Sequence, residues 1–96
     1  MVTVWAPQAI AELKRAFEYI NQDSPQNAKN VITEITALAD KLPEHPEMFA
    51  PDKYKKENDG SWRAFEKYHY RISYRITKNN IRIIRMRHTS RSPLNY

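Results

Sequence analysis

The sequence of 96 residues contains no cysteine and a single glycine. Without cysteine, disulfide bonds, cysteine-ligated zinc and thiol catalysis are excluded, and we expect a protein of a reducing compartment, the cytoplasm. The histidines, His45, His69 and His88, lack the paired spacing of a metal site, so neither a metal nor another cofactor is predicted. Long apolar runs are also missing, and no basic segment opens the chain. We therefore expect no membrane span and no signal peptide.

Acidic residues are scarce in the last third of the chain. Residues 61–96 hold nine Lys and Arg and one carboxylate, Glu66, whereas residues 1–60 hold seven Lys and Arg and ten Asp and Glu. The net charges are +8 and −3, which sum to +5 for the whole chain. Such an asymmetry predicts an anionic partner, either nucleic acid or an acidic protein. Apolar residues make up 41% of the chain, as in a globular protein, and its length predicts one domain over residues 1–96.

The first half predicts a short strand and two helices. Residues 2–4 alternate between apolar and polar side chains, as a strand does. Apolar residues at helical spacing then predict a helix over residues 7–21. Ser24 is a favourable N-cap and Pro25 suits the first helical position, so a second helix is expected over residues 25–41. The short link between them predicts an antiparallel helical hairpin.

The second half predicts an antiparallel sheet. Residues 43–60 read as an irregular connector, either a solvated link or a binding loop. Alternation of apolar and polar side chains predicts a strand near residues 62–67 and another over residues 70–76. After an asparagine turn, the last strand starts at Ile81, and its alternation slips by one residue. A β-bulge near residues 83–84 would explain the slip, as would burial of both faces.

These elements predict an α+β fold. Its N-terminal strand and two-helix hairpin would pack on one face of a C-terminal antiparallel sheet of three strands. The other face would be basic and partly open, with Arg71, Arg75 and either Arg85 or Arg87 exposed on it. An exposed basic sheet face is the feature on which the functional interpretation depends.

The order of elements and the C-terminal residues resemble the RelE/ParE superfamily of toxins, the toxin halves of bacterial type II toxin–antitoxin pairs. The resemblance rests on the strand at residues 70–74, the strand at residues 81–88 and the trailing Arg91, with Trp5 and the Ser24-Pro25 helix start also fitting. It implies the fold described above and an acidic antitoxin as partner. Two activities occur in the superfamily. RelE-like members cut mRNA on the translating ribosome, whereas ParE-like members inhibit DNA gyrase.

The resemblance to RelE-like enzymes also implies a set of catalytic residues. An Arg after the Tyr of the middle strand corresponds to Arg71, an Arg beyond the last strand to Arg91, and a C-terminal Tyr to Tyr96. His88 lies near the place where related members carry a histidine. Two lysines of the first sheet strand in RelE fall on Trp62 and Ala64 here. The predicted RNA-binding residues are Arg63, Lys67, Arg75, Arg85 and Arg87.

Cleavage of RNA without a metal needs a base, an acid and fixed cations around one phosphate. Arg71 and Arg91 would clamp the phosphate, while His88 and Tyr96 would exchange protons in an order that the sequence leaves open. The favoured function is therefore a toxin that cleaves mRNA on the ribosome. A gyrase inhibitor without chemistry of its own and a non-toxic binding module are the alternatives.

Overall fold

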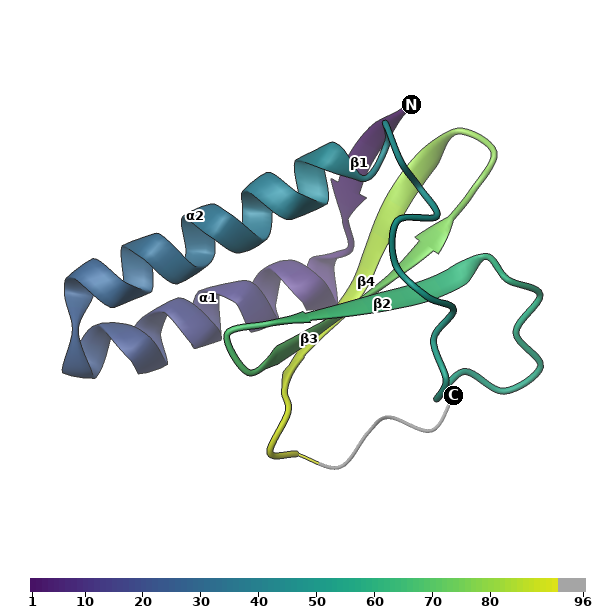
Figure 1. Ribbon diagram of the computed structural model, residues 1–96. Helices are drawn as coiled ribbons and strands as arrows, with labels where there is room; N and C mark the ends of the chain where they lie inside the picture. The colour runs from purple at the N-terminus through teal and green to yellow at the C-terminus, as the bar shows by residue number, and fades with distance from the viewer. Residues whose placement is uncertain (92–96) are drawn as a thin grey trace.

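Figure 1 shows a computed structural model of the chain, which describes residues 1–91. The elements follow the order β1 (Val2–Trp5), α1 (Pro7–Asp23), α2 (Pro25–Lys41), β2 (Trp62–Lys67), β3 (Tyr70–Ile76) and β4 (Asn80–His88). The α+β fold class is confirmed, and so are both helices. Helix α1 runs two residues beyond its predicted end, and α2 has its predicted bounds. In the part of the chain that the structure describes, no helix is long and apolar enough to cross a membrane.

The sheet has four strands in the order β1-β4-β3-β2. Strands β2, β3 and β4 form the predicted antiparallel meander. Strand β1 pairs in parallel with β4, with Val2 opposite Asn80 and Trp5 opposite Ile83. The parallel pairing of the first strand with the last was not predicted, because a sequence pattern marks a strand without naming its neighbour.

Ser24 shapes both helices of the hairpin. Its backbone N–H donates to the Ile20 carbonyl and ends α1, while its side-chain oxygen accepts the Asn27 N–H at 3.2 Å and caps α2. Proline occupies the start of each helix, where its missing N–H costs nothing. One residue thus serves as stop and start, which holds the link between the helices to a single position.

The core lies between the helical hairpin and one face of the sheet. Six large side chains are entirely inaccessible to solvent: Ile35, Leu42, Ile72, Tyr74, Ile81 and Ile83. Burying a side chain of this size stabilises the fold by roughly 1.5–3 kcal/mol. Buried alanines, Ala9 and Ala16 of α1 among them, let the helices approach the sheet closely. The core therefore draws on both halves of the chain.

The predicted β-bulge in the last strand is confirmed. Ser73 lies opposite Arg85 and Tyr74 lies opposite Ile83, so Ile84 is the extra residue on β4. The bulge resets the alternation and places both Ile83 and Met86 on the buried side. It explains why a simple period of two fails in this strand.

The connector after α2 is part of the packed structure. The Asp52 backbone N–H donates to the Trp62 carbonyl at 2.8 Å, and Pro51 forms a β-bridge with Arg63, so the connector covers the outer edge of β2. Phe49 stacks on Phe65 with 4.8 Å between ring centroids. Of the two interpretations left open, a solvated link does not describe these contacts, because the segment shields a sheet edge that would otherwise be exposed.

The turn between β2 and β3 is anchored to the helical layer. Tyr68 and His69 have φ values of 53° and 66°, a left-handed backbone that Gly or Asn usually supplies. The Tyr68 hydroxyl donates a hydrogen bond to Glu34 of α2. That bond raises the pKa of Tyr68, with a smaller contribution from partial burial. The contact compensates for the unfavourable backbone conformation of the turn and holds the β2–β3 turn against α2.

Candidate functional site

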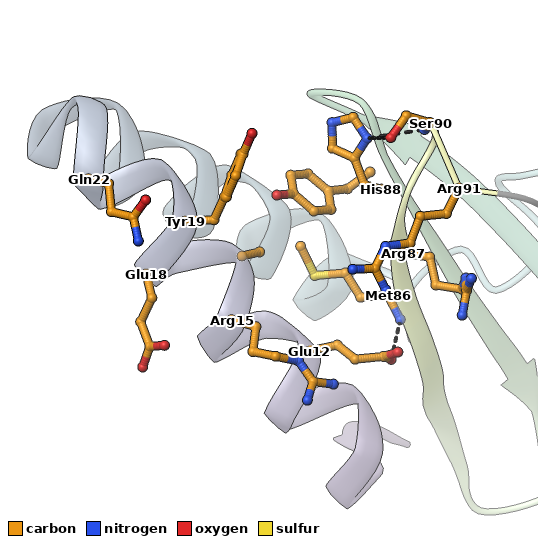
Figure 2. Close-up of a pocket in the computed structure, with 12 residues that line it drawn as sticks. Glu12, Arg15, Glu18, Tyr19, Gln22, Met86, Arg87, His88, Ser90 and Arg91 are labelled. Carbon is orange, nitrogen blue, oxygen red and sulfur yellow. Dashed lines mark hydrogen bonds between the residues drawn. The ribbon is translucent and has the colours of Figure 1, made fainter.

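A groove lies between α1 and the second half of β4 (Figure 2). Its volume is about 500 Å³, and we call it the α1–β4 groove. Its lining includes Glu12, Arg15, Ala16, Glu18, Tyr19, Gln22, Tyr70, Met86, Arg87, His88, Ser90 and Arg91. Two of the predicted catalytic residues, His88 and Arg91, are therefore brought together here.

His88 is oriented by its own chain. Its Nδ1 atom accepts the Ser90 backbone N–H at 3.1 Å and lies 2.7 Å from the Ser90 hydroxyl (Figure 2). The Tyr70 and His88 rings are nearly perpendicular with 5.2 Å between their centroids, and the centroid of the His69 ring lies 6.3 Å from that of His88. Because Nδ1 is an acceptor, neutral His88 carries its proton on Nε2. In this tautomer the Nε2–H can donate a hydrogen bond, whereas the ring gives up a proton only from its imidazolium form.

Tyr70 is a second titratable ring in the groove, next to Tyr19. Burial raises the pKa of its phenol, the neighbouring Tyr19 raises it further, and Arg91 opposes both effects. The phenol therefore stays protonated at neutral pH and can only donate or accept a hydrogen bond. It is better suited to holding His88 in place than to acting as a base.

Glu12 closes the base of the groove. Its carboxylate accepts hydrogen bonds from Arg85 Nε and Nη2 at 2.9–3.1 Å and from the Met86 backbone N–H at 2.9 Å. Only 9% of its side chain is exposed. The bonds neutralise the charge of Arg85. They also give a partner to the Met86 N–H, which lies on the edge of β4 beyond Ile83, the last residue that pairs with β1. Glu12 therefore has a structural role that sequence reasoning missed, since a helical Glu gives no signal of a partner 73 residues away.

Arg71 lies outside the groove, on the opposite face of the sheet. Its neighbours Tyr70 and Ile72 point into the buried side, so alternation along β3 directs Arg71 the other way. Its guanidinium contacts Asp52 at 2.7 Å and Glu66 at 3.2 Å, and it lies 4.7 Å from the centre of the Tyr54 ring. The Asp52 side chain is 1% exposed, so this ion pair is largely buried. Arg71 and His88 therefore face opposite sides of the sheet.

The predicted RNA-binding residues are also dispersed. Arg63 donates to the carbonyls of Gly60 and Phe49, and Lys67 lies over the Tyr68 ring. Arg85 is paired with Glu12, and Arg87 lines the groove, whereas Arg75 is exposed. Arg71 and Arg75 lie on the uncovered face of the sheet, as expected, but Arg85 is paired with Glu12 and Arg91 lines the groove, so the basic residues do not all gather on one open face. Ion pairs with the acidic first half of the chain hold Arg71 and Arg85, and Tyr96 lies outside the described residues.

A second cluster of cations and aromatic rings lies beside Arg71. Lys55 Nζ and the Arg75 guanidinium lie 4.9 and 4.8 Å from the centre of the Trp62 ring. Arg82 follows next across the sheet, because it lies directly opposite Arg75. Arg82 was not among the predicted site residues, although pairing the predicted strand ends, Ile76 with Ile81, would have placed it opposite Arg75. Within residues 1–91, no three His, Asp or Glu side chains are grouped so as to hold a metal ion.

Comparison with known proteins identifies the fold and the family. A family model described as the ParE toxin of the type II toxin–antitoxin system parDE matches residues 3–93. Among solved structures, the chromosomal ParDE toxin–antitoxin system from P. aeruginosa matches with a TM-score of 0.72 and 20% identity, over 92% of this chain and 95% of that chain. The YoeB dimer from Staphylococcus aureus matches with a TM-score of 0.59 and 18% identity, over the same shares. No curated protein matches the sequence.

Proposed function

Because this chain belongs to the ParE toxin family and is the toxin of a type II toxin–antitoxin module, we propose that it inhibits DNA gyrase by binding and without chemistry of its own. The supporting observation is the separation of Arg71 from His88 by the thickness of the sheet. Transesterification of RNA needs its cations and its proton carrier around one phosphate. A side chain held by a buried carboxylate on the far face does not meet that requirement.

An inhibitor that only binds and an enzyme differ in the amount of protein needed for their effect, and this difference tests the proposal. Purified full-length protein should stop supercoiling of relaxed plasmid only when it approaches a molar equivalent of gyrase, since a stoichiometric inhibitor does not turn over. In a translating extract, the 5′ ends of mRNA should be unchanged at the same concentrations. Cleaved mRNA at amounts far below one equivalent, with supercoiling intact, would replace this proposal with the nuclease.

The ribosome-dependent endoribonuclease remains the second candidate, because one observation favours it. The α1–β4 groove is lined by both His88, whose imidazolium form would serve as the acid, and Arg91, whose guanidinium would clamp the phosphate. If mRNA is cleaved, His88→Gln should abolish cleavage and leave the melting temperature within about 2 °C, since His88 is partly exposed. Full cleavage by that variant would exclude His88 from the reaction.

A toxin of this family has an antitoxin partner. We propose that the antitoxin presents acidic groups to the cations of this chain and that both act in the cytoplasm, where gyrase and ribosomes are found. The excess of positive charge over residues 61–96 supports complementarity of this kind. The small protein encoded beside the toxin should co-purify with it, and high salt should weaken the complex. A complex indifferent to salt would argue for apolar contacts instead.

A further inference from the structure

A serine and a histidine are in contact in the α1–β4 groove. His88 ends β4 and Ser90 follows it in the next turn, and the Ser90 hydroxyl lies 2.7 Å from His88 Nδ1 (Figure 2). The Ser90 backbone N–H also donates to Nδ1, at 3.1 Å. A ring nitrogen that accepts an N–H carries no proton, so the hydroxyl is the donor in the shorter contact. Ser90 is therefore hydrogen-bonded to the basic nitrogen of a neutral imidazole.

This contact has the geometry of a nucleophile beside its general base. A serine hydroxyl is a weak nucleophile until a base within about 2.6–3.2 Å takes its proton as the new bond forms. The Ser90 N–H holds Nδ1 toward the hydroxyl, and the nearly perpendicular Tyr70 ring packs against the imidazole. Ser90 is exposed and His88 is partly buried. A reagent in the groove can therefore reach the hydroxyl while the base stays in place.

Ser61 provides a contrast within the same chain, because its hydroxyl also contacts a possible base. That hydroxyl donates to Asp59 Oδ1. The hydrogen bonds from Ser61 are the main cause of the lowered pKa of Asp59, and a carboxylate with a lowered pKa accepts protons poorly. An imidazole is the side chain best matched to proton transfer near neutral pH. Of these two serines, Ser90 is the one with an effective base.

The lining of the groove favours an anionic electrophile. Arg15 of α1 and Arg91 lie in this lining, and among residues 1–91 none of the ion pairs between side chains includes either of them. Of the carboxylates in the lining, Glu12 is paired with Arg85 and Glu18 is exposed to solvent. Guanidinium groups bind phosphoryl oxygens in a bidentate manner. A phosphoryl group is therefore the electrophile that suits both the serine and its surroundings.

The size of the groove and the composition of the chain favour a small phosphoryl donor over a nucleotide. The groove has a volume of about 500 Å³. The chain has a single glycine, Gly60, which is not in the lining, so it has no glycine-rich loop to hold a triphosphate. An acyl phosphate is small and anionic, and its carboxylate is a good leaving group.

We propose that Ser90 is a phosphoryl acceptor, with His88 as its general base and an acyl phosphate as the donor. Ser90 Oγ forms a bond to phosphorus while the bond from phosphorus to the acyl oxygen breaks, and the carboxylate leaves with the electron pair. The hydroxyl proton passes to His88 Nδ1 and then to water. The product places a charge of about −1.5 to −2 in the groove. This modification goes beyond gyrase inhibition and needs neither DNA nor mRNA, so either proposal can fail while the other stands.

Mass spectrometry of the treated protein tests the proposal. Full-length protein would be incubated with acetyl phosphate, and separately with a neutral fluorophosphonate, and the modified residues would be mapped in digests over time. Ser90 should react at least about 100-fold faster than Ser61, since a general base contributes about 10²–10⁴-fold. No adduct on Ser90, or equal rates at the two serines, would overturn the proposal. Modification by the neutral reagent alone would overturn the assignment to a phosphoryl donor.

Three variants test the role of each neighbour. His88→Gln should slow modification of Ser90 by about 100-fold or more with both reagents, because Gln keeps an acceptor for the Ser90 N–H but is not a base. His69→Asn removes the adjacent imidazole and suits the left-handed backbone there, so it should leave the rate within about twofold. Arg91→Gln should slow only the reaction with acetyl phosphate, by about tenfold. Equal losses in the two histidine variants, or equal effects of Arg91→Gln on both reagents, would contradict the proposal.

Discussion

Replacing Asp52 with Asn tests whether Arg71 is a structural residue. The carboxylate accepts hydrogen bonds from Arg71 at 2.7 Å and from the Tyr54 backbone N–H at 3.0 Å, and its side chain is 1% exposed. Asn has nearly the same shape but no charge. The change therefore leaves the largely buried Arg71 guanidinium without its main counter-ion while barely altering packing.

The expected loss of stability follows from burial. Removing one partner of a fully buried ion pair costs about 3–5 kcal/mol, and a hydrogen bond to a charged group is worth about 1.5–3 kcal/mol. Arg71 keeps Glu66 and is 18% exposed, so we take a lower figure of about 2 kcal/mol. Unfolding entropy near 2.1 cal/mol/K per residue gives roughly 200 cal/mol/K for the chain, so Asp52→Asn should lower the melting temperature by about 10 °C.

Glu66→Gln is the matched control, because it removes a carboxylate from the same guanidinium. The Glu66 side chain is 55% exposed at 3.2 Å from Arg71, and an exposed pair is worth about 0–1 kcal/mol. Scanning calorimetry of the two variants should therefore show a large shift for Asp52→Asn and a small one for Glu66→Gln. Equal shifts in the two variants, or an unchanged melting temperature in Asp52→Asn, would refute the burial argument. Arg71 would then again be a candidate catalytic residue.

Two further perturbations follow from the described contacts. Glu12→Gln should cost about 2 kcal/mol in urea unfolding, because Arg85 and the Met86 N–H lose a charged acceptor, whereas the exposed Glu18→Gln should stay within about 0.5 kcal/mol. Burial raises the pKa of Tyr70 and Tyr74 above 10.0, so the folded state holds these protons more tightly than the unfolded state. The stabilisation that arises from this difference in pKa between the two states is fully present below about pH 10. It is lost as pH rises through the raised pKa values of the folded state. Urea midpoints recorded from about pH 9 to about pH 11.5 should therefore fall less steeply in the variant carrying both Tyr→Phe changes. An identical fall would mean that other groups carry the effect.

Local signals in the sequence sufficed for the elements but not for all of their pairings. Pro25 and the apolar spacing of α2 are properties of neighbouring residues, and they gave that helix its observed bounds. The slipped alternation around Ile84 likewise indicated the bulge. The parallel pairing of β1 with β4 depends on contacts between residues nearly 80 positions apart, and no local pattern encodes it.

The candidate site was harder to predict, because charge alone does not show where a side chain points or what neutralises it. Arg71 and Arg85 read as free cations, yet each has a distant carboxylate partner, Asp52 and Glu12 respectively. His88 lies two residues after Met86 in β4, and both line the groove on the side of the sheet that borders α1. Arg82 could have been found by pairing strands across the turn, a step that needs only the positions of the strand ends.

The partnership of β1 with β4 has a consequence for synthesis. Residues 2–5 leave the ribosome before residue 83 does, so their backbone must wait for its neighbour to emerge. At about 5–20 residues per second, this interval is roughly 4 to 16 s. The helical hairpin can form during the delay, since its contacts are local, whereas the sheet cannot be completed. The sheet of a nascent toxin is thus completed only after residue 83 has emerged, and this interval is the time in which an antitoxin already present can meet the unfinished chain.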